Sequence, residues 1–138
     1  MLTYKLINNS KLTFVYESLL TEEFLNEYIC KCTISVDTNN KWTISQWYAN
    51  KNYQHQGYGR MTMKYLVTEL FKKYGLPNQL VYIWNNANTY VYDWIHKNFD
   101  ARLSDQAIKV LKYSDEDIKE GHEYYLNITK FLKYFEVL

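Results

Sequence analysis

The sequence predicts an α+β fold in which hairpins build an antiparallel sheet and one strand–helix–strand unit adds a parallel pair of strands. The first observation is that runs rich in aromatic and β-branched residues alternate with Asn-rich turns in the N-terminal third of the chain. The second is that a strand-like run, a glycine turn, an amphipathic segment and an unbroken apolar run follow one another in the middle. That order is typical of a βαβ unit.

The N-terminal part contains two predicted hairpins. Their turns are expected at Asn8–Ser10 and at Asp37–Asn40, where Asn and Asp favour turn conformations. For Thr21–Glu27, between the hairpins, one helical turn and an irregular loop fit the residues equally well. The four predicted strands are Leu2–Leu6, Leu12–Glu17, Ile29–Val36 and Trp42–Ala49.

A helix is predicted after the second hairpin because apolar residues recur there at helical spacing. Gly75 can end this helix in a left-handed conformation, and Pro77, the only proline, cannot continue it. The apolar run Leu80–Trp84 then predicts a central strand covered on both faces. The apolar positions of the helix are Met63, Leu66, Val67, Leu70, Phe71 and Tyr74.

The C-terminal third predicts two more helices and two more strands. Tyr90, Val91, Trp94 and Ile95 share one face of a second helix. An acidic loop over Ser114–Gly121 separates the two strand-like runs. The strands are expected at Ala107–Tyr113 and His122–Leu126, and a short final helix at Thr129–Phe135.

Two of the four glycines, Gly57 and Gly59, lie in Gln54-His-Gln-Gly-Tyr-Gly59, at the predicted start of the first long helix. Glycine lets the backbone adopt positive φ and approach a ligand closely. The first N–H groups of a helix lack partners within it, so this turn offers an anion site made of main chain. A third glycine, as in dinucleotide-binding turns, and the Gly-Lys-Ser/Thr of a P-loop are both missing.

Composition narrows the function classes. The 138 residues, 47% of them hydrophobic, fit one domain over residues 1–138. No apolar stretch reaches about 18 residues, and the first residues do not resemble a signal peptide, so we expect a cytoplasmic protein without a membrane partner. A net charge of +1 without a basic stripe argues against nucleic acid as a partner.

Two residue types have a structural and a functional interpretation, and the structural one is favoured for both. Cys30 and Cys32 share one strand face, which predicts buried thiols and no metal site, because two further ligands are unaccounted for. Tyr, Phe and Trp form 18% of the chain and could stack on bases, but we expect most of them to build the core.

The segment Trp47–Arg60 resembles the acetyl-CoA signature of the GNAT superfamily of N-acetyltransferases, a strand followed by Arg/Gln-x-x-Gly-x-Gly/Ala and a helix. The resemblance implies that backbone N–H groups of the turn bind the CoA pyrophosphate and that the preceding strand pairs with pantetheine. It also implies that Gln54 shapes the turn from behind while His55 faces solvent. The cofactor-binding residues implied here are Trp47, Tyr48, Ala49, Gln54, His55, Gln56, Gly57, Tyr58, Gly59 and Arg60.

A second segment, Asn85–Tyr92, is similar to the GNAT pattern Asn-x-x-Ala-x-x-Leu-Tyr, whose tyrosine lies near the thioester sulfur. Asn85 and Tyr92 match it, and Asn88 stands in place of the alanine. Asn85 and Asn88 thereby join the implied cofactor-binding residues, and Tyr92 becomes the implied catalytic residue. Asn98-Phe99 stands where Gly-Phe usually closes this helix, two residues later than usual, so Tyr90 is the alternative catalytic tyrosine.

The family resemblance also refines the predicted fold. It implies a mixed, mainly antiparallel twisted sheet of about seven strands, two main helices, a short C-terminal helix and reduced N-terminal helices. Trp42–Ala49 and Leu80–Trp84 should be parallel neighbours that diverge at their C-terminal ends. The helices that are reduced here commonly help to form the acceptor side of the cleft, so the resemblance does not identify the acceptor.

The implied reaction is direct transfer of acetyl from acetyl-CoA to an amine of a small molecule or protein. An alkylammonium, with a pKa near about 10.4, must lose a proton before it attacks. Tyr92 would protonate the leaving thiolate, and a backbone N–H of Trp47–Ala49 would polarise the thioester carbonyl. Three residues are candidates for the general base: Glu17, Glu27 and His122.

Two alternatives stay open beside the enzyme. The chain could be a catalytically weak GNAT-fold protein that binds a partner, for example in phage–host interaction, since it also resembles small acetyltransferases of phages and prophages. It could instead bind single-stranded nucleic acid through its aromatic residues, against which the near-neutral charge argues. A monomer and a homodimer are equally compatible with the sequence.

Overall fold

The computed structural model describes residues 1–21, 28–83, 89–105 and 122–138. Seven strands form one sheet in the order β1-β2-β3-β4-β5-β7-β6. The strands are β1 Leu2–Asn9, β2 Thr13–Thr21, β3 Tyr28–Asp37, β4 Lys41–Ala49, β5 Gln79–Ile83, β6 Arg102–Leu103 and β7 Glu123–Tyr125. The helices are the short 3₁₀-helix η1 Lys51–Tyr53 and the α-helices α1 Tyr58–Tyr74, α2 Thr89–Phe99 and α4 Ile128–Tyr134.

All neighbouring strands are antiparallel except β4 and β5, which run parallel. Their pairing extends from Lys41 opposite Gln79 to Ile44 opposite Tyr82. The predicted mixed, mainly antiparallel sheet of seven strands is confirmed, and so is the predicted parallel pair.

The first hairpin is longer than the sequence predicted. A register shift between Leu6 and Asn8 lets the strand continue through the two asparagines that we expected in the turn. The turn instead forms at Ser10, whose hydroxyl accepts hydrogen bonds from the backbone N–H groups of Leu12 and Thr13, at 3.3 and 3.0 Å. The strand predicted to stop at Glu17 continues to Thr21.

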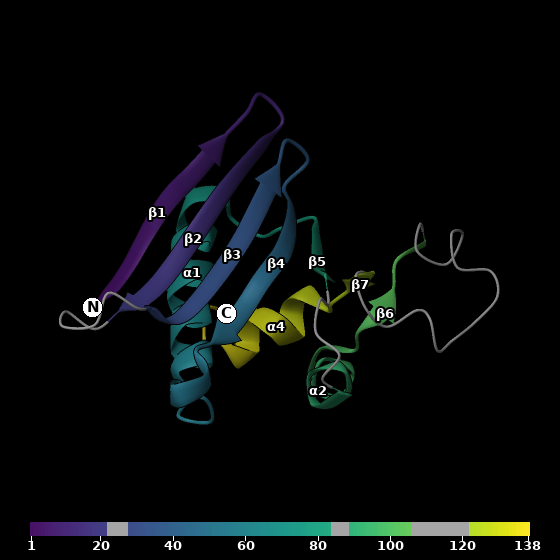
Figure 1. Cartoon of the computed structure of the whole chain (residues 1–138). Helices are drawn as coiled ribbons and strands as arrows, with labels where there is room; N and C mark the ends of the chain where they lie inside the picture. The colour runs from purple at the N-terminus through teal and green to yellow at the C-terminus, as the bar shows by residue number, and fades with distance from the viewer. Residues whose placement is uncertain (22–27, 84–88, 106–121) are drawn as a thin grey trace.

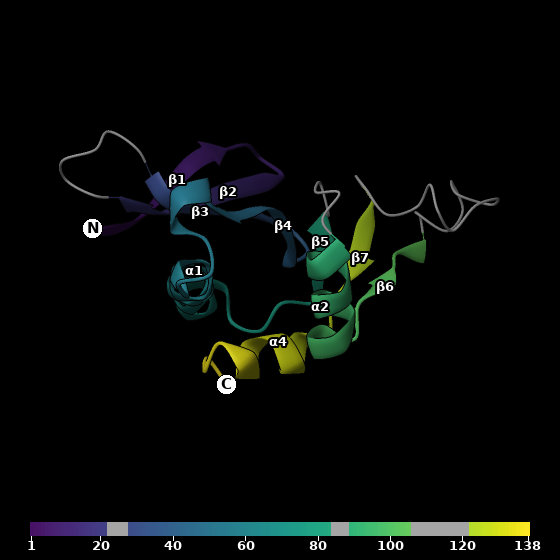
Figure 2. The ribbon, with the colours of Figure 1, turned by 60° about the horizontal axis from the view of Figure 1, so that its bottom comes forward.

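Helix α1 covers one face of β1–β4, as Figures 1 and 2 show from two directions. The predicted face is buried at Met63, Leu66, Val67 and Leu70. Gly75 ends the helix with φ +70°, and its N–H donates to the carbonyl of Phe71 at 2.8 Å. The predicted aromatic core is confirmed by the buried rings of Tyr16, Trp42, Phe99, Tyr124, Phe131 and Phe135.

The C-terminal elements agree with the sequence in part. β7 lies within the predicted strand His122–Leu126, and α4 begins one residue before the predicted helix, where the Asn127 side chain accepts from the N–H of Lys130 at 3.0 Å. The two-residue β6 was not predicted, because it is too short to show alternation. The predicted strand Ala107–Tyr113 lies outside the described residues.

In the described part of the chain, no helix covers the face of β1–β4 opposite α1, and Figure 2 shows α1 and α4 together on the other side. Cys30 and Cys32 are buried and free, as predicted, and the described residues contain no cluster that could hold a metal ion. None of the described helices is long and apolar enough to span a membrane.

Candidate functional site

The glycine turn lies at the N-terminus of the 17-residue helix α1. Gly57 precedes the helix with φ +82°, and no side chain caps the helix. The carbonyl of Gly57 accepts from the N–H of Met61 at 3.1 Å, so the N–H groups of the first turn are left without partners in the helix. The first turn also lacks acidic residues, so the site suits an anion.

Glycine is suited to positions 57 and 59 for different structural reasons. Gly57 and its exposed neighbour His55 both have positive φ, +82° and +64°. Gly59 lies inside α1 without positive φ, so positive φ is a reason for glycine at Gly57 but not at Gly59. A Cβ on Gly59 would lie 3.5 Å from Nε1 of Trp47, whereas a Cβ on Gly57 would meet nothing within 4 Å.

β4 extends beyond β5 at the end that leads to the glycine turn. Within the described residues, the last pairing of β4 with β5 is Ile44 opposite Tyr82, whereas Gln46–Ala49 pair with β3. A β-bulge lies here, since Thr33 pairs with Gln46 while Ile34 pairs with Ile44. A bulge bends and twists its strand. The expected divergence at the C-terminal ends of the parallel pair involves Trp84, which lies outside the described residues.

Trp47 connects this end of β4 to the glycine turn. Its indole Nε1–H donates to the carbonyl of Gly59 at 3.0 Å. Its ring also lies in a cluster of aromatic rings from β5, α2 and α4. The ring centroids of Tyr82, Trp94, Phe131 and Phe135 are 6.3, 5.3, 6.4 and 5.8 Å away.

Other residues of the implied CoA segment make local contacts. The Tyr48 hydroxyl bonds to that of Tyr28 at 2.7 Å, and this bond together with burial raises the pKa of Tyr48 to about 12. Gln54 is exposed and donates through Nε2 to the carbonyl of Ala49 at 3.4 Å. Gln56 is exposed, and Tyr58 begins α1.

Arg60 is directed towards the C-terminal segment. Its guanidinium lies 4.9 Å from the ring centre of Tyr134, donates to that residue's carbonyl at 3.4 Å, and lies 3.7 Å from the carboxylate of Glu136. This placement offers a second role for Arg60, in holding α4 against the start of α1.

Tyr92, the implied catalytic residue, lies in α2 with its ring centre 4.2 Å from that of His96 and 5.7 Å from that of Tyr124. Nδ1 of His96 is 2.7 Å from the carbonyl oxygen of Tyr92. Burial, and to a lesser extent Tyr92, raises the pKa of Tyr124 to about 12. Neither His96 nor Tyr124 was predicted as a neighbour of Tyr92, although His96 follows Tyr92 at helical i,i+4 spacing.

The structure does not describe the side chains of three predicted site residues. Asn85 and Asn88 fall outside the described residues, and Tyr90 belongs to α2 although its side chain is not described. α2 is nevertheless placed next to the end of β4, because Trp94 contacts Trp47. The structure thus brings the glycine turn, the end of β4 and the helix of Tyr92 around one tryptophan.

The structure describes two of the three candidate bases. Glu27 lies outside the described residues, and His122 precedes β7, where it is partly buried. Glu17 is in the middle of β2, two strands from β4, and not near a strand end as we expected. Its two carboxylate oxygens lie 3.5 and 3.3 Å from the ammonium groups of Lys5 and Lys31.

A cavity of about 470 Å³ lies elsewhere, at the opposite end of β5. Its walls include Gln79, Arg102, Tyr125 and Asn127. Asp100, also in the wall, pairs with Lys130 at 2.7 Å, and Arg102 lies over the ring of Tyr125. This cavity shares no residue with the glycine turn, so it is not part of the candidate site.

Comparison with known proteins identifies the class of protein that has this fold. The profile of the acetyltransferase (GNAT) family matches residues 8–99. The chain therefore belongs to the GNAT family of acetyltransferases. A sequence search of curated proteins gave no significant match.

Solved structures show the same fold at low sequence identity. A GNAT-family acetyltransferase from Staphylococcus aureus Mu50 has a TM-score of 0.58 at 9% identity, over 84% of this chain and 68% of its own. A putative streptothricin acetyltransferase from Bacillus anthracis, solved with acetyl-CoA, has a TM-score of 0.50 at 18% identity, over 86% and 64%. A tandem GNAT protein from the clavulanic acid pathway has 0.51 at 12% identity, over 70% of this chain and only 31% of its own.

Proposed function

We propose that this protein transfers the acetyl group of acetyl-CoA directly to an amine, on a small molecule or on a protein. The observation that carries the proposal is the extension of β4 past β5 into an uncapped glycine turn. The end of the extended strand, Trp47–Ala49, places its backbone where it can pair with the amide groups of pantetheine. The turn offers N–H groups and the positive end of the α1 dipole to the pyrophosphate.

In the proposed reaction the deprotonated amine attacks the thioester carbonyl carbon. A carbon–nitrogen bond forms, the carbon–sulfur bond breaks, and the thiolate of CoA leaves. A backbone N–H from Trp47–Ala49 stabilises the negative charge that develops on the carbonyl oxygen. The hydroxyl of Tyr92 gives its proton to the leaving thiolate and later regains one from solvent. The proton of the amine passes to a base or through water.

The experiment is to incubate the protein with acetyl-CoA and a mixture of amines, and to follow the release of the CoA thiol. We expect release that depends on both the protein and the amine, together with an acetylated amine detectable by mass spectrometry. Reactions without amine measure hydrolysis, and reactions without protein measure spontaneous transfer. Acetyl-CoA binding without amine-dependent release would contradict catalysis and favour a partner-binding role on the same fold.

A further inference from the structure

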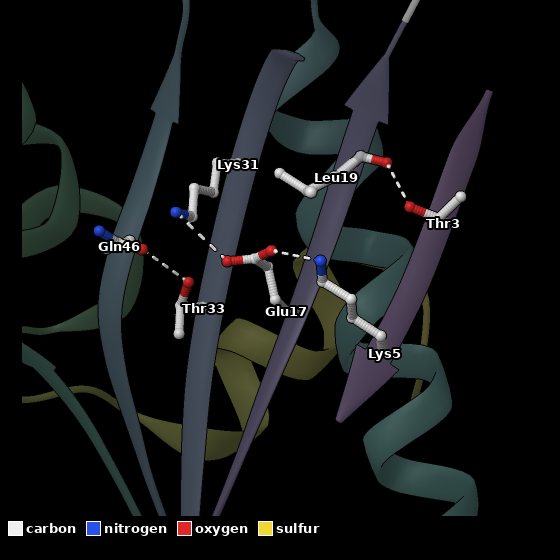
Figure 3. A network of polar contacts seen from close by, with 7 residues as sticks. All are labelled: Thr3, Lys5, Glu17, Leu19, Lys31, Thr33 and Gln46. Carbon is white, nitrogen blue, oxygen red and sulfur yellow. Dashed lines mark hydrogen bonds and ion pairs between the residues drawn. The ribbon is translucent and has the colours of Figure 1, made fainter. Parts of the chain in front are cut away.

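A row of polar side chains crosses the sheet on the face opposite α1 and ends at the extended part of β4. The four residues are in register across four strands: Lys5 opposite Glu17, Glu17 opposite Thr33, and Thr33 opposite Gln46. Figure 3 shows these side chains together on one face, with α1 behind the strands. We call Lys5, Glu17, Thr33 and Gln46 the cross-strand row.

The carboxylate of Glu17 carries the negative charge of this row. Its side chain is only 8% exposed, and each of its oxygens faces a lysine, Lys5 at 3.5 Å and Lys31 at 3.3 Å. Burying an unpaired carboxylate is strongly unfavourable, so these ion pairs account for its place on the sheet. Among the described residues, two ammonium groups around one carboxylate give this part of the face a net positive charge.

Lys31 places part of that charge beside the proposed acetyl-CoA strand. It lies directly opposite Tyr48 in the pairing of β3 with β4, and Tyr48 belongs to the extension beyond β5. Its side chain is 24% exposed, and Nζ lies 5.9 Å from the ring centre of Tyr28, whose hydroxyl bonds to Tyr48. The pair with Glu17 and this ring contact keep the ammonium group near the sheet.

Gln46, at the end of the row, adds a second donor. The hydroxyl of Thr33 donates to its Oε1 at 2.8 Å, which turns the amide NH₂ away from Thr33. The amide group that Gln46 presents to a ligand is therefore its NH₂. Next to the extended part of β4, Lys31 thus offers an ammonium group and Gln46 an amide donor, and the one carboxylate of the row is already paired.

We infer that the acceptor is a small primary amine that also carries an anionic group, a carboxylate or a phosphate, which Lys31 and Gln46 bind. This inference rests on the proposed acetyl transfer. A net positive face attracts an anion and disfavours a second cationic group, so a diamine is a poor acceptor here. The anion sits on Lys31 while the amine reaches the end of β4.

Four amines of similar length test this selection: β-alanine, its amide, O-phosphoethanolamine and 1,3-diaminopropane. We expect kcat/KM for β-alanine to exceed that for its amide by at least about tenfold, with the diamine lowest. O-Phosphoethanolamine carries a phosphate where β-alanine carries a carboxylate. Whichever of these two amines has the higher kcat/KM identifies the anion that Lys31 binds.

Variants at Lys31 test the residue itself. Lys31→Gln should raise KM for the preferred anionic amine about tenfold and remove the preference over the neutral amide, while Lys31→Arg retains it. Lys41→Gln is the matched control, because Lys41 is similarly exposed, at 28%, and pairs with Glu123 at the other end of β4. It should leave the selectivity unchanged.

Equal kcat/KM for β-alanine and its amide, or a preference for the diamine, would overturn the inference. The inference would also fail if acetyl-CoA stabilised the protein but none of the four amines were acetylated. The proposed acetyl transfer would survive that result, with a different amine as the acceptor. Absence of stabilisation by acetyl-CoA would count against the proposed function, and the inference would fall with it.

Discussion

The indole Nε1–H of Trp47 donates a hydrogen bond of 3.0 Å to the carbonyl of Gly59. One end of this contact is in the part of β4 that extends beyond β5, and the other is in the first turn of α1. The bond therefore fixes the position of the proposed pantetheine strand relative to the proposed pyrophosphate turn. Aromatic rings from β5, α2 and α4 surround the same indole.

Replacing Trp47 with phenylalanine removes this donor and keeps an aromatic ring. We expect Trp47→Phe to lower the free energy of unfolding by about 1–3 kcal/mol and to reduce the stabilisation that acetyl-CoA provides. Trp42→Phe is the control, because its buried indole also makes one hydrogen bond, to Asn40 Oδ1 at 2.9 Å, at the far end of β4. Denaturant unfolding with and without acetyl-CoA measures both. Equal loss of ligand stabilisation in the two variants would contradict the role given to Trp47.

Gly57 and Gly75 allow a matched test of the turn. Both have positive φ, +82° and +70°, and a Cβ on either would meet nothing within 4 Å. Alanine at either position should destabilise the fold by about 1–2 kcal/mol, because an L-residue disfavours the left-handed conformation. Only Gly57→Ala should weaken acetyl-CoA binding, since Gly75 lies at the opposite end of α1. Isothermal titration of both variants with acetyl-CoA checks this, and similar affinities would exclude Gly57 from the site.

Tyr92→Phe should lower turnover by about 10²–10⁴-fold and leave acetyl-CoA affinity almost unchanged, because it removes a proton donor and keeps the ring. Tyr124→Phe is the control, since this buried ring contacts Tyr92 but has no assigned role in the reaction. Steady-state kinetics with an identified acceptor distinguish the two. Full activity in Tyr92→Phe would remove this residue from the mechanism and make Tyr90→Phe the next variant to measure.

Ser18, on β2 opposite Tyr4 and Cys32, carries a buried hydroxyl that has no hydrogen-bond partner among the described residues. Ser18→Ala should raise the free energy of unfolding by about 1 kcal/mol, because it removes an unsatisfied polar group. Thr33→Val should lower it by about 1 kcal/mol, because the buried Thr33 hydroxyl does bond, to Gln46. Urea unfolding compares the two, and a destabilised Ser18→Ala would show that its hydroxyl contributes to folding.

Local patterns predicted most of the fold. The apolar spacing of α1, its end at Gly75 and the parallel pairing of β4 with β5 all follow from residue types within a short stretch of chain. Element ends were less predictable. A bulge near Ile7 moved the first turn, and such a shift depends on the pairing partner in β2, which the local pattern does not identify.

Contacts between distant segments were beyond the sequence analysis. The glycine turn and Tyr92 come from short motifs, but the meeting of Trp47 with Gly59 and Trp94 depends on how α1 and α2 dock on the sheet. The ion pairs of Glu17 with Lys5 and Lys31 likewise need the register of three strands. Glu17 was a candidate base because it lies at the end of the strand predicted from the sequence, and its partners in the structure assign it a different role.

The most direct measurement of the central claim is the thermal unfolding of the unmodified protein with acetyl-CoA, CoA and adenosine. A ligand that binds only the folded state adds RT ln(1 + [L]/Kd), about 2.7 kcal/mol at a hundredfold excess over Kd. For a domain of this size, that should raise the Tm by several degrees. We expect this shift with acetyl-CoA and CoA, and a far smaller one with adenosine, which has no phosphate for the glycine turn. No shift with millimolar acetyl-CoA, or equal shifts with all three ligands, would contradict the account.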